Sequence, residues 1–230
     1  MEFKDKVVLI TGASKGLGLK LSEILLDKGA KVIGVYNNTL IPLVYVDAFK
    51  CDISKELEII DLFKYIKGKY GRLDYVINCA AISKDKDITE KTKEEFMEVL
   101  EVNLVGTFLI CKNALNIMDK GAIVNISSTN ATTTFNPISL DYDASKAALE
   151  NLTKNLAIRY PKIKIIALAP NWIDTESVLE MSPVYLEQEL RRVGQKELIK
   201  KEDVSNKVLE IIIDNNINSG DIIRMDDVNE

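Results

Sequence analysis

The stretch that decides the fold reads Thr11-Gly12-Ala13-Ser14-Lys15-Gly16-Leu17-Gly18. It follows a short apolar run at 7–11 and leads into a segment of helical period that begins near Leu17. The three glycines let the backbone turn sharply, approach a pyrophosphate closely and pack the helix against a sheet, while the helix N-terminus adds free amides and a partial positive charge. The stretch therefore predicts a dinucleotide-binding turn, although such a turn taken alone could be only a tight connection between strand and helix.

Short β-branched runs alternate with helical segments along the rest of the chain. After 7–11, the predicted strands are 32–36, 49–51, 75–79, 122–127, 163–168 and 221–225. This alternation is typical of βαβ units and predicts a three-layer α/β Rossmann fold with a doubly wound, seven-stranded parallel sheet. No repeat, low-complexity tract or linker marks a second domain, so residues 1–230 are predicted to form a single NAD(P)-binding domain.

Two connections between strands contain residues that predict their local structure. Thr92 and Glu95 have the spacing of a capping box, which predicts the start of the helix before Asn103. The connection 36–49 is only about the dozen residues that a parallel crossover needs, and Pro42 disfavours a regular helix there. We therefore expect that crossover to be a loop.

The composition excludes several classes of function. The chain has 230 residues, 47% of them hydrophobic, and a formal net charge of -5 without a long basic run, which argues against a nucleic-acid partner. No apolar stretch approaches the roughly 20 residues of a membrane span, and the charged segment 1–6 does not resemble a signal peptide. These features predict a cytoplasmic protein with no membrane partner.

The titratable side chains narrow the chemistry further. The three cysteines lie far apart and have no CxxC spacing, so we expect no disulfide framework. Because the chain has no histidine, no Cys/His zinc site can form and no metal site is predicted. Acid–base chemistry near neutral pH must then use another side chain with a shifted pKa.

The motifs along the chain resemble those of the short-chain dehydrogenase/reductase family, in the family's order. The TGxxxGxG spacing resembles its cofactor loop, and the resemblance includes 3-oxoacyl-carrier-protein reductase-like and sugar or alcohol dehydrogenase-like members. The further matching segments are Cys51-Asp52-Ile53, Asn78-Cys79-Ala80-Ala81, Asn103, the strand ending in Ser127-Ser128, Tyr142 with Lys146 as YxxxK, and Pro170 to Thr175 as PGxxxT.

This resemblance implies a set of site residues. The implied catalytic residues are Tyr142, Lys146, Ser128 and Asn103. The implied cofactor-binding residues are Gly12, Ser14, Lys15, Gly16, Leu17, Gly18, Asn37, Asp52, Ile53, Asn78, Ala80, Tyr142, Lys146, Pro170, Ile173 and Thr175.

The choice of nicotinamide cofactor depends on charge at the end of the second strand. An acidic residue there would bind the ribose 2′-hydroxyl and repel a 2′-phosphate, but the sequence has Tyr36-Asn37-Asn38. Lys15 stands where NADP-preferring relatives carry a basic residue, although it could equally be a solvated loop lysine. The sequence favours NADP, with NAD as the alternative.

The YxxxK motif occurs three times, so position must separate its copies. Tyr65 lies late in a helix that leads into a strand, and Tyr160 precedes Pro161 at a helix exit. Only Tyr142 begins a helix soon after a strand end, which is where ligands bind in an open parallel sheet. The four-residue spacing places Tyr142 and Lys146 on one helical face, where we expect the ammonium to lower the pKa of the phenol.

The family resemblance also assigns roles. It implies that Lys146 binds the nicotinamide ribose, that Ser128 orients the substrate carbonyl and that Asn103 holds a water in a proton path. Ser127 is the alternative to Ser128. The prediction is an NADP-dependent enzyme that reduces a carbonyl or oxidises the secondary alcohol by hydride transfer, with Tyr142 as acid and base.

Departures from the family pattern keep two other functions open. Ala81 and Asn171 replace glycines, and Ser128 lies one residue farther from Tyr142 than the serine of the family does, so a catalytically weak NAD(P)-binding regulatory protein is the first alternative. Met225-Asp226-Asp227 replaces the usual Asp-Gly-Gly, so we expect altered subunit contacts there. An epimerase or dehydratase of the extended relatives is the second, although these need a larger C-terminal domain than the residues after Thr175 provide.

Two segments carry predictions beyond the catalytic residues. The region 175–202, with Trp172 and the apolar positions of 178–190, could form a substrate lid or an amphipathic surface helix packed on the sheet. The helices at 103–118 and 144–159 correspond to those that pair between subunits in relatives, which implies a homodimer or homotetramer.

Overall fold

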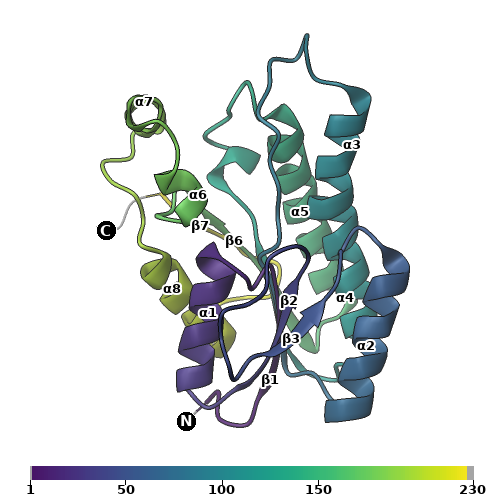
Figure 1. Ribbon diagram of the computed structural model, residues 1–230. Helices are drawn as coiled ribbons and strands as arrows, with labels where there is room; N and C mark the ends of the chain where they lie inside the picture. The colour runs from purple at the N-terminus through teal and green to yellow at the C-terminus, as the bar shows by residue number, and fades with distance from the viewer. Residues whose placement is uncertain (1, 227–230) are drawn as a thin grey trace.

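The computed structural model describes residues 2–226 and contains one parallel sheet in the order β3-β2-β1-β4-β5-β6-β7 (Figure 1). The strands are β1 (Val7–Thr11), β2 (Lys31–Tyr36), β3 (Asp47–Lys50), β4 (Tyr75–Asn78), β5 (Gly121–Ile126), β6 (Ile163–Pro170) and β7 (Ile222–Met225). Each lies within a few residues of its predicted position. The seven-stranded, doubly wound sheet and the single domain are confirmed.

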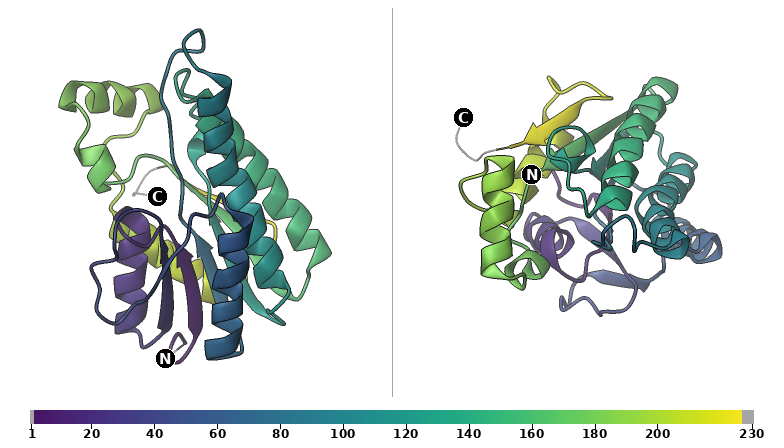
Figure 2. Two further views of the ribbon diagram at one scale, coloured as in Figure 1. Left: turned by 45° about the vertical axis from the view of Figure 1, so that its right-hand side comes forward. Right: turned by 90° about the horizontal axis from the view of Figure 1, so that it is seen from above.

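Helices cover both faces of this sheet. They are α1 (Gly16–Asp27), α2 (Glu56–Tyr70), α3 (Lys93–Leu100), the π-helical η1 (Glu101–Gly106), α4 (Thr107–Leu115), the 3-10 turn η2 (Thr129–Ala131), α5 (Leu140–Arg159), α6 (Glu176–Leu179), α7 (Pro183–Val193) and α8 (Lys201–Ile213). Helices α1 and α8 lie on one face, and α2, α4 and α5 lie on the other (Figure 2). This arrangement gives the predicted three layers.

The alternation of side chains along β1 builds a core on each face. Val8 and Ile10 pack with α1 and α8, whereas Val7 and Leu9 pack with α2 and α4, because successive strand residues point to opposite faces. All five residues of β1 are buried, as expected for a central strand of a parallel sheet. The glycine turn after Thr11 is therefore attached to a fully buried central strand.

The strand order reverses direction next to β1. The chain runs from β1 outward through β2 to β3, then returns to the other side of β1 at β4. Such a reversal opens a crevice beyond the carboxyl ends of the strands, where ligands bind in folds of this kind. The segments that follow β1, β4, β5 and β6 all begin at this crevice.

The local predictions have mixed outcomes. Thr92 caps α3, and its side chain and that of Glu95 form the reciprocal capping box. The segment between β2 and β3 contains no helix, as predicted from Pro42. The prediction of a surface helix packed on the sheet over 178–190 is wrong. Pro183 starts a new helix, α7, which has no buried residue and stands beside the sheet's upper end (Figure 2).

None of the helices within residues 2–226 combines the length and apolar character required to cross a bilayer. Of the predicted C-terminal departure Met225-Asp226-Asp227, Asp227 lies outside the described residues.

Candidate active site

One cavity of about 580 Å³ lies at the carboxyl ends of the strands. Its wall includes most of the predicted site residues: Gly12, Ser14, Lys15, Gly16, Leu17, Gly18, Asn37, Asp52, Ile53, Ala80, Ser128, Tyr142, Lys146, Ile173 and Thr175. Asn78, Asn103 and Pro170 are not part of this wall. The structure therefore brings the two halves of the predicted site, nucleotide turn and YxxxK helix, into one space.

The glycine turn has the geometry of a close backbone approach. Gly12 has a φ of +69°, and a Cβ there would lie 2.9 Å from the Cα of Ala80. A Cβ on Gly18 would overlap the carbonyl oxygen of Gly12. Both positions thus require glycine, which fits a turn shaped to hold a pyrophosphate.

The N-terminus of α1 already binds an anionic group. The amide of Gly16 donates to a carboxylate oxygen of Glu176 at 2.8 Å, and Lys201 donates to the other oxygen at 2.6 Å. The hydrogen bond from Lys201 is the largest of the effects that lower the pKa of Glu176. Because this amide binds a negatively charged oxygen of a carboxylate, it can also bind a phosphate oxygen. The residues of the turn therefore fit a dinucleotide.

The first turns of α5 place the YxxxK pair on one face. The backbone amide of Tyr142 donates to the Asp141 carboxylate at 2.9 Å. Lys146 is buried and its Nζ donates to the carbonyl of Ile126, at the end of β5, at 2.7 Å. This Nζ lies 5.4 Å from the centroid of the Tyr142 ring, so both groups can reach one ligand.

The pKa of Tyr142 shifts in the direction opposite to the one that the sequence predicted. Burial raises the pKa of Tyr142 to about 12, a hydrogen bond with Ser128 lowers it, and the charges of Asp143 and Asp85 raise it. The net shift is therefore upward, opposite to the lowering that the sequence predicted from Lys146, whose Nζ donates to the Ile126 carbonyl. Burial also lowers the pKa of Lys146 to about 8.

Ser127 and Ser128 point in different directions. Ser128 lies on the cavity wall within hydrogen-bonding reach of Tyr142. Ser127 is buried, and its hydroxyl donates to Glu150 at 3.2 Å, away from the cavity. The geometry therefore favours Ser128 over Ser127 as the hydroxyl that meets a ligand.

Asn103 lies behind the cavity wall, inside the π-helical segment η1. Its side-chain oxygen accepts from the amide of Ile82 at 2.8 Å, and its Nδ2 donates to the carbonyl of Ile82 at 2.9 Å and to Ser145 at 3.1 Å. Its side chain thus joins the segment after β4 to α5. The backbone carbonyl of Asn103 accepts from Thr107 at 2.9 Å.

The other two residues behind the wall are also buried. Nδ2 of Asn78 donates to Asn125 at 2.8 Å, which links the ends of β4 and β5. Pro170 ends β6 and pairs in register with Met225 of β7. Both residues support the strand ends that carry the cavity.

Comparison with known proteins decides the family. A family model described as short chain dehydrogenase matches residues 6–184, most of the chain. The protein belongs to this family. As a short-chain dehydrogenase it is an oxidoreductase that interconverts carbonyl groups and the corresponding CH–OH groups.

The relatives of this short-chain dehydrogenase are named for different substrates. It is 35% identical over 188 residues to carbonyl reductase family member 4 of Xenopus laevis, covering 77% of this chain and 79% of that protein. It is 30% identical over 224 residues to a 3-oxoacyl-[acyl-carrier-protein] reductase of Thermotoga maritima, covering 91% of each. These matches confirm the resemblance to reductases of the family.

Two solved structures share the fold of this short-chain dehydrogenase. Ligand-free aldohexose dehydrogenase of Thermoplasma acidophilum has a TM-score of 0.88 at 28% identity, covering 98% of this chain and 94% of that one. A Tyr-to-Phe variant of ElxO with NADPH bound has a TM-score of 0.80 at 27% identity, covering 97% of each chain.

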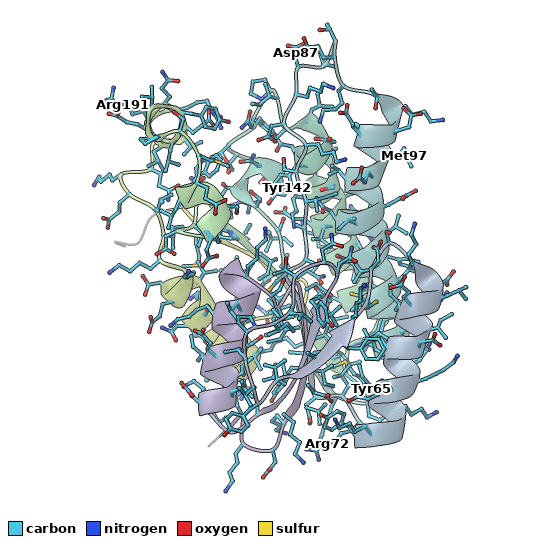
Figure 3. The ribbon with its side chains drawn as sticks, viewed as in Figure 1. Tyr65, Arg72, Asp87, Met97, Tyr142 and Arg191 are labelled. Atoms are coloured by element: carbon cyan, nitrogen blue, oxygen red, sulfur yellow. The ribbon has the colours of Figure 1, made fainter. Side chains whose placement is uncertain are left out.

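The other two YxxxK copies of the short-chain dehydrogenase lie elsewhere. Tyr65 and Lys69 both bind Asp47, at 2.6 Å and 2.8 Å, at the end of the sheet opposite to Tyr142 (Figure 3). Lys164, the partner of Tyr160 in the third copy, donates to backbone carbonyls at 2.6 Å and 3.1 Å. Neither of these two copies lines the cavity that contains Tyr142 and Lys146.

Sequence reasoning missed the polar part of the wall beyond Tyr142. The missed cavity residues are Ser83, Asp85, Asn130, Asn136 and Ser139. They lie in the segments after β4 and β5. Only their position after strand ends could have indicated them, because they match no motif of the short-chain dehydrogenase family that we identified.

Proposed function

We propose that this short-chain dehydrogenase uses NADP and that Tyr142 is its general acid and base. The observation that carries the proposal is that Tyr142 and Lys146 share one helical face on the wall of the cavity that also contains the glycine turn. A bound nicotinamide would supply or accept the hydride. The proton is then left to the chain's own residues.

The protonation state of Tyr142 suits the reductive direction. A phenol with a pKa raised to about 12 keeps its proton at neutral pH and can donate it to the oxygen of a carbonyl as that oxygen gains charge. Ser128, which already meets the phenol, would donate a second hydrogen bond to the same oxygen and orient it.

Lys146 and Asn103 complete the proposed proton path. Lys146 is held at the edge of the cavity by the Ile126 carbonyl and would bind the ribose of the cofactor with its remaining N–H groups. Because the Asn103 side chain is engaged by Ile82 and Ser145, its backbone carbonyl, with a second lone pair, would hold the water of the path.

The proposed preference for NADP rests on charge near the end of β2. The residues that follow Tyr36 there are Asn37 and Asn38, which carry no charge to repel a 2′-phosphate, and Lys15 lies on the same cavity wall and is exposed. The NADPH found in the ElxO variant is consistent with this preference within the family. Asp52 and Ile53, also on the wall, would lie beside the adenine.

Replacing Lys15 tests the cofactor preference. We expect Lys15→Ala to weaken NADPH binding about fivefold, the effect of losing roughly 1 kcal/mol of an exposed ion pair, and to leave NADH binding unchanged. Fluorescence titration of both cofactors measures the two Kd values. Lys28→Ala, at the far end of α1, is the matched control, and an equal loss for NADPH and NADH would contradict the assignment of Lys15 to the phosphate.

The pH dependence tests the role of Lys146. Because the pKa of Lys146 is lowered to about 8, its ammonium is present below that pH and is lost above it. We therefore expect kcat/KM for carbonyl reduction to fall as pH rises through about 8. In Lys146→Arg the guanidinium keeps its charge, so this decline should vanish even though the absolute rate is lower; the same decline in both proteins would assign it to another group.

Two further proposals concern the whole enzyme. Val178 and Met181 line the cavity from the segment around α6, which supports a substrate lid within 175–202. Val105 and Phe108 of η1 and α4 are each 42% exposed, and Ile158 of α5 is 82% exposed. These apolar faces support pairing of subunits into a homodimer or homotetramer in the cytoplasm.

A further inference from the structure

We propose that the substrate is a neutral polyhydroxylated compound, a sugar or polyol, whose hydroxyl groups bind the Asp85 carboxylate beside Tyr142. The inference deepens the proposed function and rests on it for the site of reaction. Three features of the described wall beyond Tyr142 support the inference: a carboxylate with a free oxygen, nearby cations that are already paired, and a tryptophan.

Asp85 provides a preorganised acceptor for hydroxyl groups. Its Oδ1 accepts from the hydroxyl of Ser139 at 2.7 Å and from that of Ser83. No described residue donates to its Oδ2, and Asp85 is exposed on the cavity wall. Ser139, which donates to Asp85, is the N-cap residue of α5 and precedes Tyr142 by three residues, and Asp85 and Tyr142 line the same cavity, so the carboxylate and the phenol can both face one small molecule. A carboxylate oxygen held in this way binds the hydroxyls of a polyol by charge-assisted hydrogen bonds.

The cations near Asp85 are paired with other carboxylates. In the segment after β4, Lys84 binds Glu98, Lys86 binds Glu95 and Lys91 binds Asp141. The lysines on the described cavity wall are Lys15, in the glycine turn, and Lys146. With Lys15 and Lys146 engaged by the cofactor, a substrate with its own carboxylate or phosphate would meet the negative charge of Asp85 without a further cation on the described wall to neutralise it. This arrangement disfavours an anionic substrate.

Trp172 adds an apolar surface to the same cavity. It follows β6, which is the neighbour of the strand that leads to Ser128, and it lines the cavity with Met181. Gln195 fixes its position, because the side chain of Gln195 pairs with both the amide and the carbonyl of Trp172, at 3.0 Å and 2.8 Å. A flat indole can cover the C–H face of a sugar ring while its hydroxyls face polar groups.

An apolar substrate would use this wall poorly. A steroid or a long acyl chain would cover Asp85 without replacing the water bound to its charged oxygen, and burial of an unpaired charge is unfavourable. The neighbouring Asn136 and Ser139 are themselves buried polar side chains of the wall. Hydroxyl groups on the substrate are the chemistry that this surface can satisfy.

Trp172 makes binding directly measurable, because it is the only tryptophan of the chain. The probes are D-glucose, D-mannose and sorbitol, compared with cyclohexanol as an apolar alcohol and gluconate as an anion. Each is titrated into Tyr142→Phe protein loaded with NADP, and the tryptophan fluorescence is followed. We expect saturable changes with at least one neutral sugar or polyol, and at least tenfold weaker binding of cyclohexanol and gluconate.

Asp85→Asn in the same background should raise the Kd of that sugar or polyol at least tenfold and leave the Kd of cyclohexanol unchanged. Asp87→Asn is the matched control, because Asp87 is at the outer tip of the same segment (Figure 3) and does not line the cavity. Failure of every neutral probe to bind, tighter binding of cyclohexanol or gluconate, or an unchanged Kd in Asp85→Asn would each overturn the inference.

Turnover by the wild-type protein separates this inference from the proposed function. If apolar ketones are reduced but no sugar or polyol binds, the proposed function stands and the inference is wrong. If sugars bind with the expected dependence on Asp85, the substrate class stands, even where Tyr142→Phe proves as active as wild type and the assignment of Tyr142 fails.

Discussion

Replacing Tyr142 with phenylalanine should lower kcat about a thousandfold, within the range that a positioned general acid contributes. The change removes one oxygen atom, the only group on the described wall that pairs an ionisable proton with a hydrogen bond to Ser128. The ring and the 5.4 Å separation from Lys146 should remain, so the Kd for NADPH should stay within about twofold of wild type. Steady-state kinetics and fluorescence titration measure the two quantities separately.

Tyr65→Phe is the matched control for this experiment. It changes a tyrosine in another YxxxK sequence, whose hydroxyl binds Asp47 at the opposite end of the sheet. We expect its kcat to equal that of wild type. If Tyr142→Phe kept full activity, or if both variants lost it equally, Tyr142 would not be the acid.

The fold was predictable because its signals are local and repeated. Val7 to Thr11 are uniformly apolar or β-branched. Glycines are required in the turn that follows because any side chain there would clash with the backbone, as a Cβ on Gly12 would with Ala80. The Thr92 capping box needs only residues three positions apart. Signals of this kind can be recognised in the sequence without knowledge of the tertiary structure.

The site was predictable only in part, because its electrostatics depend on contacts between distant segments. The spacing of Tyr142 and Lys146 predicted that they share one helical face. It could not predict that the Ile126 carbonyl binds the ammonium or that burial raises the pKa of Tyr142. Asp85 reaches the cavity through a loop with no periodicity. The irregular chain between strand and helix, which carries Asp85, is the part that a sequence pattern describes least.

The fixed position of Tyr142 also depends on a buried ion pair. Lys91 binds Asp141 at 2.6 Å, and the exposed fractions of the two side chains are 3% and 0%. Asp141 accepts the amide of Tyr142, while Lys91 also donates to the carbonyl of Lys84. The pair therefore ties the segment that carries Asp85 to the first turn of the helix that carries Tyr142.

Lys91→Met should destabilise the protein by about 3–5 kcal/mol, because it leaves the Asp141 carboxylate buried without its partner. For a chain of this size that corresponds to a Tm lower by roughly 10 °C. Thermal unfolding followed by circular dichroism measures it. Lys84→Met, which breaks the more exposed pair with Glu98, should cost no more than about 1 kcal/mol.

A second substitution separates the charge effect from simple loss of packing. In Lys91→Met with Asp141→Asn, the unpaired charge is gone and the Asn oxygen can still accept the Tyr142 amide, so much of the lost stability should return. A double variant no more stable than Lys91→Met would show that the lysine acts through its contact with the Lys84 carbonyl and its aliphatic stem. Recovery would instead establish that Asp141 requires a cation only because it is buried where it holds the helix that carries Tyr142.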